Sequence, residues 1–264
     1  TETFTEFGDT LAAEYRALGF TILLGPQMDL ITEPRWSRVT GAITEDYQMN
    51  ADMANAYVSA MQTTDEKIED YGLDEGWGAE SVSAIAKHWP SGGNGENGYD
   101  AHKDVGKFGV YPGDGFEAAA ESFAGGAGLD PEDNSTSATA AGIMPYYTIS
   151  TDQDPSGQNV GNGFSEYLVT DLLRGDYNYD GVVCTDWKIT GTDGTDSQPN
   201  TSWGLESGKG YTTAYRFYQV IKAGCDQIGG SGSLTDLKAG YEIMAYGSEE
   251  FGVVGVGEEA ATER

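Results

Sequence analysis

The 264-residue chain carries 43 acidic and 14 basic residues, which gives a formal net charge of −29 at pH 7. A field of this sign repels nucleic acid and anionic lipid, and no basic stripe reverses it locally. Hydrophobic residues make up 38% of the chain, enough to bury a core, and no apolar run approaches the ~18 residues of a membrane span. The acidic surplus indicates a well-solvated surface, as in a salty or extracellular setting.

Apolar runs of strand length alternate along the chain with amphipathic runs of helix length. We expect helices at about 10–18, 49–61, 165–173, 212–223 and 234–244, and strands at 21–25, 82–89, 141–147, 181–186 and 225–229. Loops rich in glycine and polar residues are expected at 91–106, 125–140 and 191–210. Because the strands are almost uniformly apolar, they are predicted to be parallel and covered on both faces.

This alternation predicts an α/β chain with a (β/α)8 barrel architecture, for which eight strands are needed. Only five strands are recognisable, so residues 1–264 are expected to form a partial barrel domain. The two cysteines, Cys184 and Cys225, lie in or beside apolar runs and are predicted to be buried thiols rather than a disulfide.

The segment GDYNYDGVVCTDW allows two interpretations. Counted from Asp176, it resembles a helix-loop-helix calcium loop through Gly181, but position 12 is then Trp187, and Asp186 falls one residue short. The run after Gly181 is also β-branched and apolar, where a calcium loop turns into a helix. We therefore predict a turn followed by a buried strand ending in Asp186, and no metal site.

Charged and aromatic residues follow the predicted strands at their carboxyl ends, which is where the reacting groups of a parallel barrel lie. They are Arg38, Lys87, His88, Tyr146, Tyr147 and Asp186. Each alone is compatible with a solvated strand end or a core position, but the shared location favours a site.

Sugar chemistry is the chemistry that this set suggests. Sugar hydroxyls are bound by charged hydrogen-bond partners, and Trp36, Trp89 and Trp187 adjoin the set, as expected if indole rings stack on a sugar face. A carboxylate such as Asp186 can attack an anomeric carbon and form a covalent intermediate that water then hydrolyses.

Five motifs resemble, in the same order, motifs of the TIM-barrel domain of family 3 glycoside hydrolases, the β-glucosidase family. They are GPQMDLITEPRWSRVTGAITEDY (25–47), KHWPSGGNGENGYDAH (87–102), IMPYY (143–147), YDGVVCTDW (179–187) and AGCDQIGG (223–230). The resemblance spans nearly the whole chain. It implies a retaining exo-β-glycosidase that releases terminal β-linked glucose and requires no metal or organic cofactor.

Carried over by position, the resemblance makes Asp186 the catalytic nucleophile. The positions that match substrate-binding residues are Arg38, Lys87, His88, Tyr147 and Trp187. The family's first two barrel strands and the domain that supplies the acid/base are not found, so a second chain or domain is expected to complete the site. An extracellular or periplasmic location is expected.

Two alternatives stay open. One subgroup of the family, the N-acetylglucosaminidases, takes its acid/base from an Asp-Ser-His in the loop after the Lys-His pair, and this chain has Asp100-Ala101-His102 there. An imidazole paired with a carboxylate suits proton transfer near neutral pH, which makes His102 a candidate acid/base. The other alternative is a carbohydrate-binding chain or fragment without catalytic activity.

Overall fold

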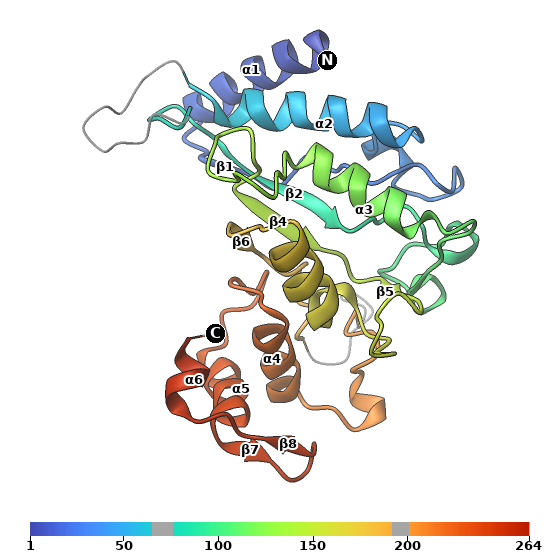
Figure 1. The fold of residues 1–264 in the computed structure, drawn as a ribbon, viewed down its shortest axis with the longest axis vertical. Helices are drawn as coiled ribbons and strands as arrows, with labels where there is room; N and C mark the ends of the chain where they lie inside the picture. The colour runs from blue at the N-terminus through green and yellow to red at the C-terminus, as the bar shows by residue number, and fades with distance from the viewer. Residues whose placement is uncertain (65–75, 192–200, 264) are drawn as a thin grey trace.

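A parallel sheet forms the centre of the computed structural model, which describes residues 1–64, 76–191 and 201–263. Its strands are β1 (Ile22–Leu23), β2 (Ser83–Trp89), β4 (Gly142–Pro145) and β6 (Val182–Val183). They lie side by side in chain order, and all three pairings are parallel (Figure 1). Consecutive parallel strands separated by helices form part of a barrel wall, which is the predicted α/β class.

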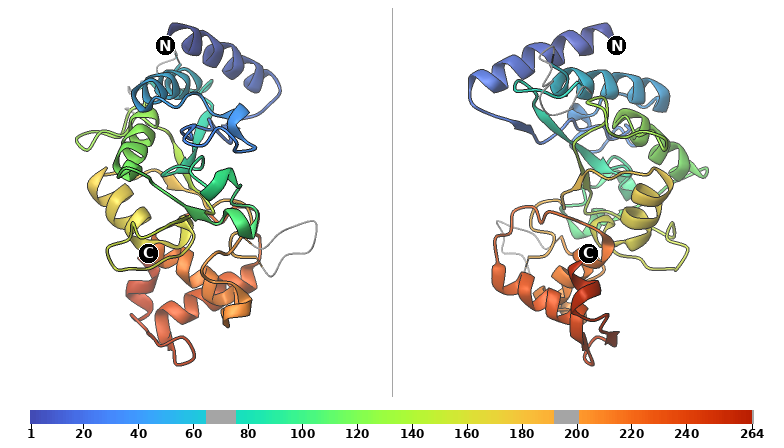
Figure 2. Two further views of the ribbon diagram at one scale, coloured as in Figure 1. Left: turned by 90° about the vertical axis from the view of Figure 1, so that its right-hand side faces the viewer. Right: turned by 60° about the vertical axis from the view of Figure 1, so that its left-hand side comes forward.

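Helices cover one side of this sheet. They are α1 (Glu2–Ala17), α2 (Tyr47–Gln62), α3 (Gly115–Gly126) and the π-helical segment η6 (Tyr167–Asp176). The helix α2 packs between α1 and α3. The left view of Figure 2 shows α2, α3 and η6 stacked along one side, while the loops after β1 and β2 project on the other.

The rest of the described chain comprises a C-terminal group of helices and several short elements. The C-terminal group contains α4 (Thr213–Ala223), α5 (Leu234–Tyr246), the antiparallel hairpin β7 (Gly247–Ser248) and β8 (Val253–Val254), and α6 (Glu258–Thr262). The short elements are the parallel pair β3 (Phe108–Gly109) and β5 (Ile149–Ser150) and the 3-10 turns η1 (Val39–Gly41), η3 (Glu96–Gly98), η4 (Asp104–Gly106), η5 (Asn162–Phe164) and η7 (Ser207–Lys209). No helix within the described ranges is long and apolar enough to cross a bilayer.

Two helices differ from the predictions because glycines lie at close helix contacts. The first helix was predicted from residue 10, but α1 begins at Glu2 and includes Gly8, where a Cβ atom would lie 2.7 Å from the Cβ of Ala60 in α2. The helix α3 was missed, and Gly126 was placed in a loop, although it ends this helix against Ala54 of α2. Glycine weakens an isolated helix, but here it allows two helices to approach closely.

The strands are shorter and less covered than predicted. The strand expected at 225–229 is reduced to a single parallel bridge between Cys184 and Gln227. The strand β4 is buried throughout, whereas Ile22 in β1 is 56% exposed and Val182 in β6 is 43% exposed. The prediction of strands covered on both faces is therefore wrong for β1 and β6. Both cysteines are buried and free, as predicted.

The side chain of Gln62, at the end of α2, joins this helix to two strands. It is completely buried, and its Oε1 accepts hydrogen bonds from the backbone N–H groups of Ala84 in β2 and Ala141 just before β4, both at 2.9 Å. Its Nε2 donates to the carbonyls of Ser137 and Thr139. One side chain thus satisfies two backbone N–H groups and two backbone carbonyls, in β2 and in the segment that leads into β4.

Replacement of Gln62 by Leu is expected to lower the free energy of unfolding by about 2–5 kcal/mol, because two backbone N–H groups lose their partners away from water. Urea unfolding followed by circular dichroism measures this difference. The matched control is Gln48→Leu, since Gln48 lies exposed on the same helix with one hydrogen bond to Asp52. Equal effects of the two substitutions would refute the role of Gln62.

Candidate active site

The residues predicted at strand ends converge at the carboxyl edge of the sheet. Lys87 and His88 belong to the last three residues of β2, and the next strand, β4, runs in register with Lys87 opposite Met144. Tyr146 and Tyr147 follow β4 directly. The rings of His88 and Tyr146 are 4.3 Å apart.

Asp186, two residues after the bridge that extends β6, is a nearly buried carboxylate with one free oxygen. Its Oδ1 accepts a 2.6 Å hydrogen bond from the Trp187 backbone N–H, whereas its buried Oδ2 has no hydrogen-bond partner within the described ranges. This Oδ2 lies 3.7 Å from Nε2 of His88. A buried polar atom without a partner is costly and marks a position for a ligand or a reaction.

Tyr147 borders Asp186, as predicted. Burial raises the pKa of its phenol far above the ordinary value, and the Asp186 carboxylate raises it further. The phenol therefore stays protonated, and it donates a 2.7 Å hydrogen bond to the carbonyl of Trp187. This bond holds the residue after Asp186 against the end of β4.

Two cations lie beside the carboxylate. The Arg38 guanidinium donates to Tyr146 Oη at 3.2 Å and to Gln27 Oε1 at 3.0 Å, and it contacts His88 Nε2 at 3.3 Å. Burial lowers the pKa of Lys87, and the charge of Arg38 lowers it further, while Asp186 opposes both effects. These groups place two cations and an imidazole on the side of the site that holds Asp186.

Asp29 was missed by the sequence analysis. Its carboxylate is completely buried, and Oδ1 accepts from the backbone N–H groups of His88 at 3.0 Å and Gly92 at 2.7 Å. Its Oδ2 lies 2.8 Å from Nδ1 of His88. The signal was present, because Asp29 is an acid inside the apolar stretch QMDLI that follows the first strand.

Asp100 and His102 form a second pair on the loop after β2. Asp100 accepts hydrogen bonds from the His102 backbone and ring, from Trp36 Nε1 at 2.9 Å and from Tyr146 Oη at 3.1 Å. The His102 ring packs edge-on at 4.8 Å from the ring of Tyr147, and its side chain is 40% exposed. The structure thus places His102 against a tyrosine that follows β4, with its side chain partly exposed.

The tryptophans correct part of the sequence interpretation. Trp36 and Trp89 are 1% and 0% exposed, so neither ring can stack on a sugar. Trp89 donates to the carbonyl of Leu168 and packs edge-on against Phe123, which makes it a core residue. Trp187 is 50% exposed and keeps an accessible ring.

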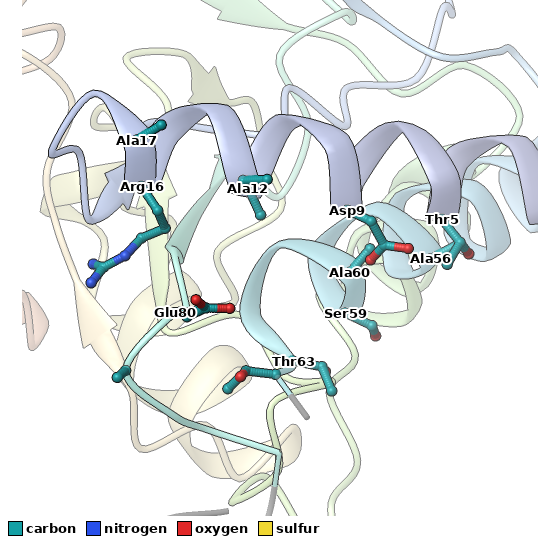
Figure 3. Close-up of a pocket in the computed structure, with 13 residues that line it drawn as sticks. Thr5, Asp9, Ala12, Arg16, Ala17, Ala56, Ser59, Ala60, Thr63 and Glu80 are labelled. Atoms are coloured by element: carbon teal, nitrogen blue, oxygen red, sulfur yellow. The ribbon is translucent and has the colours of Figure 1, made fainter. Parts of the chain in front are cut away.

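A cavity of about 570 Å³ lies beside this site. It is lined by residues of the loops after β1 and β2, namely Arg35, Ser37, Arg38, Asn97, Gly98, Tyr99, Asp100, His102 and Lys103. A larger cavity of about 1080 Å³ lies between α1, α2 and the segment around Glu80 (Figure 3). It contains none of the predicted site residues, so volume alone does not identify the site.

Comparison with known proteins shows the family to which this sequence belongs. A model of the glycosyl hydrolase family 3 N-terminal domain matches residues 1–226. The chain belongs to glycosyl hydrolase family 3. It is 37% identical over 243 residues to a periplasmic β-glucosidase/β-xylosidase of Dickeya chrysanthemi, covering 87% of this chain and 34% of the relative. It is 36% identical over 232 residues to β-glucosidase C of Emericella nidulans, covering 85% of this chain and 33% of that relative. The family 3 chain thus spans about a third of the length of these curated relatives.

Solved structures confirm the barrel-type fold of this family 3 chain. A β-N-acetylhexosaminidase from Beutenbergia cavernae superposes with a TM-score of 0.58 at 24% identity, covering 90% of this chain and 59% of that one. CbsA from Thermotoga neapolitana superposes with a TM-score of 0.64 at 14% identity, covering 99% of this chain and 46% of CbsA. At these identities the likeness concerns the fold alone.

Because Asp100 accepts several hydrogen bonds in the folded state, we expect its contribution to the free energy of unfolding to be lost in acid. Burial would raise the pKa of Asp100, but the hydrogen bonds from His102 outweigh burial and hold the pKa below its ordinary value of 3.8. Asp100 therefore stabilises the fold fully above pH 3.8, and this contribution is lost as the pH falls through the lowered pKa of the folded state.

Asp100→Asn is expected to lower the free energy of unfolding near pH 7, and its difference from the wild type should shrink as the pH falls below 3.8. Denaturant unfolding at a series of pH values measures the difference. Asp104→Asn serves as the control, because the Asp104 side chain is 73% exposed. A difference for Asp100→Asn that grows in acid would contradict the assigned direction.

Proposed function

We propose that this chain is the nucleophile-bearing part of a retaining exo-β-glycosidase that removes terminal β-linked glucose, with Asp186 as the nucleophile. The observation that carries the proposal is the free, buried Oδ2 of Asp186 among Lys87, His88 and Arg38. A carboxylate oxygen that already had hydrogen-bond donors would be a weaker nucleophile.

The proposed reaction has two displacement steps. In the first, Asp186 Oδ2 attacks the anomeric carbon while the bond to the leaving oxygen breaks, and a general acid protonates that oxygen. In the second, water attacks the same carbon while the former acid group, now acting as a base, removes a proton from that water. The bond between the sugar and Asp186 breaks, and Asp186 is released as a carboxylate. Retention of configuration follows from two inversions.

The neighbouring residues are proposed to hold the sugar during both steps. Arg38, Lys87 and His88 bind hydroxyl groups, and the half-exposed ring of Trp187 carries the apolar sugar face. Tyr147 fixes the backbone around Asp186 through its bond to Trp187. The β-glucosidase names of the curated relatives favour glucose as the substrate sugar.

The general acid is proposed to come from a part of the enzyme outside this chain. The support is that this chain matches only about a third of its curated relatives, whose remaining length leaves room for a second domain. The periplasmic relative and the strongly acidic composition support an extracellular or periplasmic location.

A second candidate is a β-N-acetylglucosaminidase with His102 as acid/base. The hydrogen bond between Asp100 and the His102 ring favours it, because a paired carboxylate orients an imidazole for proton transfer. The third candidate is a carbohydrate-binding chain without activity, which the following experiment separates from both enzymes.

A 2-deoxy-2-fluoro-β-glucoside with an activated leaving group is expected to label Asp186 stoichiometrically. The activated group departs without protonation, so the acid/base is not needed, and fluorine slows hydrolysis of the intermediate. Peptide mass mapping locates the adduct.

Asp186→Asn should abolish this labelling, while Asp180→Asn, which changes an exposed carboxylate close to the same strand, should leave it unchanged. If neither the fluoroglucoside nor the corresponding N-acetylglucosaminide labels the wild type, the chain is a binding module or an incomplete fragment, and not an enzyme on its own.

His102→Ala separates the two enzyme candidates. If His102 is the acid/base, turnover of a glycoside with a poor leaving group should fall about 10²–10⁴-fold, whereas formation of the intermediate from an activated glycoside should change little. Steady-state kinetics with a series of aryl glucosides and aryl N-acetylglucosaminides measures both. Equal effects on good and poor leaving groups would exclude His102 as the proton donor.

A further inference from the structure

We infer that Asp29 is a positioning residue that fixes the tautomer of His88, so that Nδ1 carries the proton and Nε2 presents a lone pair to the site. The inference rests on the proposed function for its catalytic consequence, but the tautomer itself is a property of this chain.

The first observation is the chemistry of the two groups that flank the His88 ring. The Asp29 carboxylate lies 2.8 Å from Nδ1, and an ionised carboxylate only accepts hydrogen bonds. The Arg38 guanidinium lies 3.3 Å from Nε2, and a guanidinium only donates. Only a ring with the proton on Nδ1 satisfies both contacts.

The second observation comes from Asp186. Its free Oδ2 lies 3.7 Å from Nε2 of His88, beyond hydrogen-bond distance, and it has no partner within the described ranges. A proton on Nε2 would face this oxygen and the Arg38 donors at once. It would repel Arg38 and be attracted to the oxygen that must attack the sugar. A lone pair on Nε2 leaves that oxygen free.

Within the described ranges, the charged side chains around His88 include two anions and two cations. Asp29 and Asp186 are the anions, on the segments after β1 and β6, and Arg38 and Lys87 are the cations. Asp29 and His88 are 0% and 2% exposed, so water does not compete for these contacts. Burial therefore makes the direction of each hydrogen bond energetically important.

Asp29 also anchors the backbone, and the two roles can be separated. Its Oδ1 accepts from the N–H groups of His88 and Gly92, while its Oδ2 faces the ring. At Gly92 a Cβ atom would lie 2.7 Å from Oδ1, so the loop approaches the carboxylate as closely as glycine allows. In Asp29→Asn the amide oxygen can keep both backbone bonds, while the amide NH₂ faces Nδ1 and can only donate to it.

The test uses nitrogen NMR of the complete chain labelled with ¹⁵N-histidine. The chain has two histidines, and a His102→Gln spectrum assigns their signals. Spectra are recorded over a pH series so that the neutral ring is observed. In the wild type, the neutral His88 ring is expected to be protonated on Nδ1, and in Asp29→Asn on Nε2.

The kinetic consequence is measured with an activated aryl glucoside. Asp29→Asn is expected to reduce kcat at least about tenfold, since loss of the group that orients a functional histidine typically costs this much or more. The control is Asp104→Asn, which changes an exposed carboxylate of the loop after β2 and should leave kcat, KM and the His88 signals unchanged. Thermal unfolding of each variant verifies that it is folded.

A wild-type His88 protonated on Nε2, or an unchanged tautomer in folded Asp29→Asn, would overturn the inference. The wild-type spectrum is decisive even if Asp29→Asn does not fold. A wild-type chain that shows Nδ1 protonation but no labelling of Asp186 supports the tautomer assignment and overturns the proposed function instead.

Discussion

The parallel pairing of β2 with β4 and of β4 with β6 is the constraint on which the site depends. Because parallel strands end at the same edge, the registers Lys87 opposite Met144 and Ile143 opposite Val183 bring three strand ends together. Residues about 100 positions apart in the chain then touch, such as His88 and Asp186. A slip of one residue in either pairing would turn these side chains to the other face of the sheet.

The carboxylates around this edge differ in how many hydrogen bonds they accept. Asp29 accepts three hydrogen bonds and Asp100 accepts four, so each carboxylate is fully occupied in orienting a histidine. In the part of the chain that the structure describes, Asp186 keeps one oxygen without a hydrogen-bond partner. Since an unpaired buried oxygen costs stability, its retention is explained by the reaction that it is proposed to perform.

The rings around the site divide into structural and accessible ones. Trp36 is buried, and its indole donates to Asp100, so its contribution is to orient the Asp100–His102 pair. Tyr146 links Arg38 to Asp100 and thereby connects the two histidine pairs. Trp187 alone among the three tryptophans near the site remains half exposed. Proximity in the sequence could not distinguish these roles, because burial depends on neighbouring segments.

The sequence by itself determined the α/β class, the order of the strands and the residues at their carboxyl ends. Strands 82–89, 141–147 and 181–186 were recognisable because their uniform apolarity is a local property, and Arg38, Lys87, His88, Tyr147 and Asp186 follow or end such runs. The helix α3 escaped notice because it begins and ends in glycines, which are poor helix formers, and Gly125 and Gly126 are explained only by their close approach to α2.

Only the tertiary structure decided which of these residues meet and what each contact does. Asp29 is inconspicuous in QMDLI until the fold places its carboxylate against a strand from more than 50 residues further along the chain. The free oxygen of Asp186 and the burial of Trp36 and Trp89 likewise depend on long-range packing. The physical reason is that hydrogen-bond satisfaction and burial are set by neighbours in space, whereas periodicity and strand ends are set by neighbours in sequence.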